Sequence, residues 1–109
     1  MASSAADRGA AAGETLDEFL HTPARLSILS LLAPADWVTF SFLRDTIATS
    51  DSALSKQLSA LENAGYVEAR KDRAARRSTS VRLTAEGRTA FEAYLTSLEL
   101  LVARSRGGA

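Results

Sequence analysis

The sequence predicts one mainly α domain of the α+β class, in which a two-stranded β-hairpin precedes a final helix. Its 109 residues suit a single compact domain. Apolar residues recur at the helical period of 3.6 as far as Gly65, alternate with period 2 as far as residue 83, and return to the helical period after Thr84. These two changes of period, together with residues typical of helix caps, predict three helices, a hairpin and a last helix.

The N-terminal part divides into a leader and a first helix. Residues 1–14 are rich in Ala, Gly and Ser and lack periodicity, so we expect a disordered leader followed by a domain over residues 15–105. A short apolar pattern at Leu16, Phe19 and Leu20 comes next. In "HTPARLSILSLL", Thr22 can cap a helix and Pro23 suits its first position.

The next two helices are joined by a very short turn. After the extended segment "WVTF", Thr39 can cap the helix "FSFLRDTIA", with Phe42, Leu43 and Ile47 facing inward. In "TSDS", Ser50 or Asp51 can cap a third helix that runs to Ala64, and Gly65 suits the left-handed residue that follows it. Two helices joined so closely predict a helix-turn-helix.

The third helix has two different faces. At 100° per residue, Leu54, Leu58 and Leu61 form one core stripe. The opposite face carries little charge, and Gln57 lies on its flank. We expect this side of the helix to carry candidate DNA contacts, namely Ser52, Ser55, Lys56, Gln57 and Ser59. Short hydroxyls, an amide and a lysine can approach a nucleic-acid groove closely, although a plain solvated face would have the same composition.

A basic hairpin follows Gly65. The segments "YVEAR" and "SVRL" alternate, placing Val67, Ala69, Val81 and Leu83 on one face. Residues 65–83 hold six basic and two acidic residues, a local charge of +4 in a chain whose net charge is zero. The connecting loop "KDRAARRS" carries Arg73, Arg76 and Arg77. Arginine suits phosphate oxygens and a narrow minor groove, although basic loops also occur on ordinary surfaces.

Together, the helix-turn-helix and the basic hairpin predict a winged helix-turn-helix, in which the third helix enters the major groove and the hairpin is the wing. The segments "HTPARLSIL", "LSKQLSALENAGYV" and "RRS…VRLTAEGR" occur in an order and spacing that resemble MarR/ArsR-type winged-helix transcriptional regulators of bacteria, especially their short single-domain branch. The resemblance covers roughly residues 16–104.

This resemblance implies a homodimeric regulator, in the first place a repressor, bound to a pseudo-palindromic operator in double-stranded DNA. It implies that the third helix faces DNA through Ser52, Ser55, Lys56 and Gln57, and the wing through Arg73, Arg76 and Arg77. Many such wings have an Asp just before the paired basic residues. Here that position is Ala75, with Asp72 three residues earlier, so the arginine that enters a minor groove is not specified.

The last helix, residues 85–105, carries an apolar stripe wider than one small domain needs. We therefore expect a dimer interface formed by Leu16, Phe19, Leu20, Phe91, Tyr94, Leu95, Leu98, Leu101 and Val102. The alternative is a terminal helix that folds back on its own core.

Other classes of protein find little support in the sequence. There is no cysteine, and His21 is the single histidine, so we expect a helix-entry role for it and no metal site or cofactor. Trp37, Phe40 and Phe42 could line an effector pocket but more often form core. No catalytic constellation, membrane span or signal peptide is evident, which favours a cytoplasmic protein without enzymatic activity. A winged helix that binds only other proteins remains the alternative.

Overall fold

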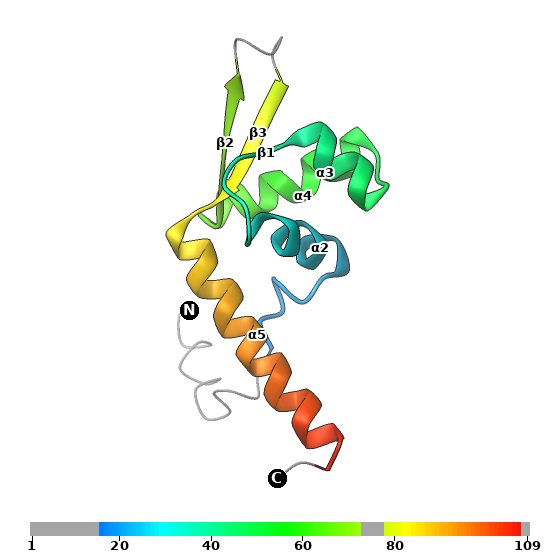
Figure 1. Ribbon diagram of the computed structural model, residues 1–109, viewed down its shortest axis with the longest axis vertical. Helices are drawn as coiled ribbons and strands as arrows, with labels where there is room; N and C mark the ends of the chain where they lie inside the picture. Colours follow the sequence, from blue (N-terminus) through cyan, green and yellow to red (C-terminus); the bar gives the residue numbers. More distant parts are fainter. Residues whose placement is uncertain (1–15, 73–77, 108–109) are drawn as a thin grey trace.

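The computed structural model describes residues 16–72 and 78–107, and these residues form four helices and three strands around one core. In chain order the elements are α2 (Pro23–Leu32), β1 (Val38–Thr39), α3 (Phe40–Ile47), α4 (Asp51–Asn63), β2 (Val67–Asp72), β3 (Ser78–Leu83) and α5 (Ala85–Ser105). Figure 1 shows β2 and β3 extending away from α2, α3 and α4, while α5 runs in the opposite direction. The predicted α+β winged-helix architecture is confirmed.

The sheet has three antiparallel strands in the order β1-β3-β2, one more than the predicted two-stranded hairpin. The hairpin itself pairs Val67 with Leu83 at its base and Asp72 with Ser78 at its far end. The additional strand is short: Val38 pairs with Val81, and Thr39 with Ser80. The segment "WVTF" therefore closes one edge of the sheet, and β2 forms the other edge.

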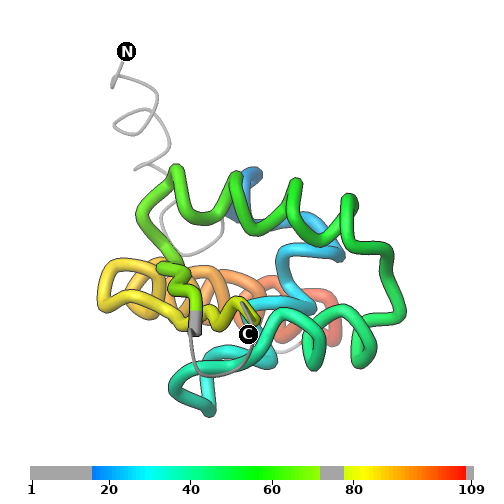
Figure 2. The backbone as a smooth tube through the Cα atoms, turned by 90° about the horizontal axis from the view of Figure 1, so that it is seen from above, coloured from blue at the N-terminus to red at the C-terminus, as the bar shows by residue number. Residues whose placement is uncertain are grey.

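The core lies where the helices meet the base of the sheet. The predicted leucine stripe of α4 is buried, with Leu54, Leu58 and Leu61 exposed by 2%, 8% and 0% respectively. These side chains pack with Ile28, Leu29 and Leu32 of α2, and with apolar residues of the other elements. Viewed from above, α3 and α4 lie on opposite sides of the molecule, and α5 lies between them in this view (Figure 2).

Side-chain caps fix the starts of three helices. The hydroxyls of Thr39, Ser50 and Thr84 accept hydrogen bonds from the backbone N–H groups of Phe42, Ala53 and Gly87 respectively. The expectation for Thr22 is wrong: it occupies the cap position of α2 but makes no capping bond, and its hydroxyl donates to Phe19 O at 3.4 Å. Gly65 has φ of +85°, as predicted for the residue that ends α4.

One expectation about a buried face is also wrong. Phe42, in the first turn of α3, was expected to face inward, yet it is 52% exposed, whereas its neighbour Leu43 is fully buried. The alternation predicted for the hairpin is observed: Val67 pairs with Leu83 and Ala69 with Val81, so the four residues share one face. Ala69 is nevertheless exposed while its partner Val81 is fully buried, because Val81 lies on the central strand β3 and Ala69 on the edge strand β2.

Candidate nucleic-acid interface

The outward face of α4 carries four of the five candidate side chains of this helix. Ser52, Ser55, Lys56 and Ser59 are all exposed, whereas the leucines on the other side anchor the helix to the core. Hydroxyls and one ammonium group on a helix of 13 residues can donate to phosphate oxygens and reach base edges. This surface has the chemistry that groove recognition requires.

Gln57, the fifth candidate on α4, lies on the flank and is half-buried. Its Oε1 accepts a hydrogen bond from Nε of Arg25 at 2.8 Å. Arg25 belongs to α2 and was not among the predicted site residues. Nothing in the local sequence indicates the contact, because the two residues are 32 positions apart and meet only when α2 packs against α4.

The turn between α3 and α4 is held by Arg44. Its guanidinium Nε donates to Asp45 at 2.9 Å, and its Nη1 donates to Asp51, the first residue of α4, at 3.0 Å. The hydrogen bond to Asp45 and the one to Asp51 raise the pKa of Arg44 above its ordinary value. Arg44 thus links the two helices of the helix-turn-helix through the side chain at the start of α4.

The predicted wing-tip residues Arg73, Ala75, Arg76 and Arg77 lie outside the described residues. On the described part of the wing, the guanidinium carbons of Arg70 and Arg82 lie 4.0 and 4.6 Å from the ring centroid of Trp37. Stacking on an aromatic ring holds a guanidinium in place while its N–H groups remain available in the plane.

Arg82 is also paired with acids. It donates to Glu68 at 2.8 Å and to Asp36 at 3.4 Å, and the hydrogen bond to Glu68 is the main cause that raises the pKa of Arg82. Side chains alternate between the faces of a strand, so Lys71 lies on the opposite face of β2 from Arg70. Lys71 is exposed near the end of the hairpin, on the same face of β2 as buried Val67.

The three aromatic residues that could have lined a pocket have separate roles. Trp37 supports the two arginines, Phe40 packs partly against the core, and Phe42 is exposed. A cavity of about 260 Å³ lies elsewhere, between α2, α3 and the start of α4. Its lining includes apolar Ile28 and Ile47, with Lys56 and Gln57 also contributing.

The candidate dimer residues fall into two groups. Leu20, Phe91 and Tyr94 are 0%, 7% and 3% exposed and belong to the core of the chain itself, with Leu16 and Phe19 packed partly against it. The C-terminal half of α5 remains uncovered, with Leu95 38% and Val102 40% exposed and Leu98 and Leu101 half-buried. Fewer of these residues are therefore open to a second copy than the predicted interface contains.

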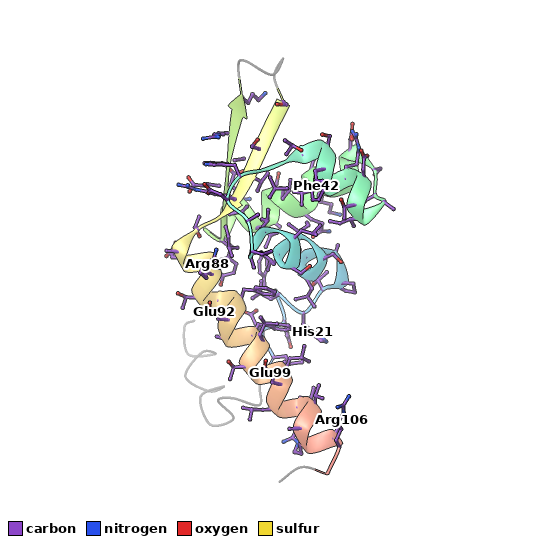
Figure 3. All side chains as sticks on the ribbon, viewed as in Figure 1. His21, Phe42, Arg88, Glu92, Glu99 and Arg106 are labelled. Atoms are coloured by element: carbon purple, nitrogen blue, oxygen red, sulfur yellow. The ribbon has the colours of Figure 1, made fainter. Side chains whose placement is uncertain are left out.

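His21 connects the N-terminal segment to α5. Its Nδ1 lies 2.8 Å from the hydroxyl of Tyr94 (Figure 3 labels His21 beside α5). In residues 16–72 and 78–107, no group of three or more His, Asp or Glu side chains is arranged to hold a metal ion. Within that same part of the chain, no helix has the length and apolar character needed to span a bilayer.

The sequence profile of a family described as winged helix DNA-binding domain matches residues 24–102. The chain belongs to this family. The match begins in α2 and ends in α5, so it includes α4 and the wing. It confirms the resemblance to winged-helix regulators that the segments around α4 and the wing had indicated.

Three individual proteins are similar to this chain over most of its length. The uncharacterized protein MJ0432 of Methanocaldococcus jannaschii is 30% identical over 79 residues, covering 72% of this chain and 86% of that protein. A transcriptional regulator homologue from Pyrococcus horikoshii OT3 superposes with a TM-score of 0.76 at 28% identity, covering 79% of this chain and 86% of its own. A possible transcriptional regulator for arsenical resistance has a TM-score of 0.62 at 32% identity, covering 80% and 92%.

Proposed function

We propose that this winged-helix protein is a transcriptional regulator that binds a pseudo-palindromic operator as a homodimer and acts as a repressor rather than an activator. The observation that carries the proposal is the outward face of α4. Its leucine side is buried, and it presents Ser55, Lys56 and Ser59 beside a hairpin with a local excess of positive charge. In winged helices this helix enters the major groove.

The wing supplies the second contact in this proposal. Lys71 and the arginines of segment 73–77 would neutralise phosphates next to the major groove or reach the adjacent minor groove. Phosphate contacts would provide most of the affinity, and α4 part of the sequence preference. The resemblance to regulators at 28% and 32% identity supports a regulatory role.

The exposed apolar half of α5 supports dimerisation. A second copy would cover Leu95, Leu98 and Val102, and the two-fold axis would set two copies of α4 on two half-sites. Repression would then be steric, because the bound dimer excludes polymerase from the operator. The proposal places the protein in the cytoplasm and assigns it no catalytic activity.

Binding of labelled genomic DNA fragments, measured by fluorescence anisotropy at several salt concentrations, tests this function. The proposal predicts binding in which log K falls linearly as log salt rises. A folded protein that binds no fragment even at low salt would contradict it and would favour a winged helix that binds only proteins.

A further inference from the structure

Arg25 occupies an unusually well-defined position between the N-terminal segment and α4. Its Nη1 donates to the carbonyl oxygen of Phe19 at 2.8 Å, and its guanidinium carbon lies 4.3 Å from the centroid of the Phe19 ring. Its Nε donates to Oε1 of Gln57 at 2.8 Å. Three contacts from two directions therefore fix the guanidinium, which is itself half-buried.

The chemistry of Arg25 determines how the Gln57 amide is oriented. A guanidinium carries only hydrogen-bond donors and stays protonated, so the Gln57 atom that faces it must be the carbonyl oxygen. The Gln57 amide NH₂ is then the end turned away from Arg25. A free glutamine can recognise adenine with both ends, accepting from N6 and donating to N7. With its oxygen held by α2, Gln57 keeps its donor end for an outside partner.

We propose that Arg25 is a positioning residue for DNA recognition, which holds Gln57 so that its NH₂ group reads a hydrogen-bond acceptor on a base edge. This inference rests on the proposed function of α4. In the major groove guanine offers O6 and N7, thymine O4 and adenine N7 as acceptors, whereas cytosine presents only its N4 donor. Gln57 therefore selects against cytosine at one position of each half-site.

The stacked Phe19 ring extends this positioning network toward the core. It makes an edge-to-face contact with Tyr66, at 6.0 Å between centroids, and Tyr66 is the residue just before β2. The orientation of Gln57 thus depends on the segment before α2, on α2 and on the junction between α4 and β2. In this proposal Arg25 influences which base is preferred through its contact with Gln57, without touching DNA itself.

Selection from a randomised DNA library, with wild type, Arg25→Ala, Gln57→Ala and Gln57→Glu, tests the inference. Wild type should disfavour cytosine at one half-site position by roughly fivefold or more. Gln57→Ala should erase this preference. Arg25→Ala should free the Gln57 oxygen to accept from cytosine N4 and so admit cytosine, while positions read by other residues stay unchanged.

One additional variant, Arg88→Ala, and the variant Gln57→Glu keep the result interpretable. Arg88→Ala removes the same charge from exposed Arg88 on α5 and should leave every base preference intact (Figure 3). Gln57→Glu retains a partner for Arg25 but replaces the NH₂ donor by oxygen, so the preference should move to cytosine or adenine, which present donors. This variant decides the question if Arg25→Ala lowers the thermal midpoint too far to be used.

The inference is overturned if Arg25→Ala weakens all sites equally with base preferences unchanged, or if Gln57→Ala and Gln57→Glu retain the wild-type preference. In both cases wild type still binds selectively, so the proposed function survives. Wild-type protein that selects no sequence at all refutes the proposed function, and the role of Arg25 falls with it.

Discussion

Gly87, in the first turn of α5, lies directly against the backbone of Tyr66. A Cβ on Gly87 would overlap the carbonyl oxygen of Tyr66 and come within 2.8 Å of its carbonyl carbon and 2.9 Å of its Cα. The same corner is held by the N–H of Thr84, which donates to Tyr66 O at 3.0 Å, and by the Thr84 hydroxyl, which donates to Gly65 O at 2.6 Å. The start of α5 is thus fixed to the short segment between α4 and β2.

Replacing Gly87 by alanine should therefore destabilise the fold, although alanine is normally the better helix former. The added methyl must push backbone atoms apart, an overpacking cost of about 2 kcal/mol or more. Urea denaturation measures the change in the free energy of unfolding. Thr96→Ala, at an exposed position of the same helix, is the control and should change it by less than about 0.5 kcal/mol. Equal stability of Gly87→Ala and wild type would show that the contact is looser than described.

Replacing Lys56 by alanine should weaken DNA binding at all sequences and make its salt dependence shallower. Lys56 is exposed on the outward face of α4, so it can neutralise one phosphate. The slope of log K against log salt should decrease in magnitude by about 1. Arg88→Ala removes an equal charge from α5 and serves as the control. The same slope for Lys56→Ala and wild type would remove Lys56 from the DNA-binding surface.

Replacing Leu95 by glutamate should convert the proposed dimer into a folded monomer. Leu95 is 38% exposed on α5, so a charge is tolerated in the single chain but not when a second copy covers it. Sedimentation velocity at micromolar concentration measures the change in mass, and circular dichroism checks the fold. Thr96→Glu adds the same charge at a neighbouring exposed position. Wild type that sediments as a monomer would rule out the dimer.

Stability at alkaline pH should depend on Tyr66. Burial, followed by the charges of Asp17 and Glu86, raises the pKa of Tyr66 above its ordinary value. The folded protein then binds the phenolic proton more tightly than the unfolded chain, so stability is lost as pH rises above about 10. Tyr66→Phe keeps the ring but has no phenolic proton, so its stability should not fall in this way. The difference in denaturation midpoint between wild type and Tyr66→Phe should therefore shift in favour of the variant from pH 7 to pH 10.5; a constant difference would contradict the raised pKa.

Local features of the fold were predictable because they depend on neighbouring residues. The hydroxyl caps at Thr39 and Thr84, the left-handed Gly65 and the leucine stripe of α4 all follow from spacing and intrinsic preference. The change of period likewise located the hairpin. These signals were sufficient for the architecture and for the outward face of α4.

Features that depend on the meeting of distant segments were not predictable. Strand β1 exists because Val38 reaches β3, and no pattern of two residues indicates such pairing. The periodicity of α3 could not show that Phe42 lies beyond the edge of the core. The contacts of Arg25 with Gln57 and of Arg70 with Trp37 join residues far apart in sequence, so their roles emerged only from packing.

Selection of genomic DNA fragments by the purified full-length protein tests the central claim most directly. A dimeric winged-helix regulator should enrich fragments that share an inverted repeat, with half-site centres about 10 base pairs or a multiple of that apart. Combining Ser55→Ala, Lys56→Ala and Ser59→Ala in one folded variant should abolish that enrichment. Recovery of fragments without any shared sequence, or equal enrichment by the triple variant, would contradict the assignment of α4 as the helix that reads DNA.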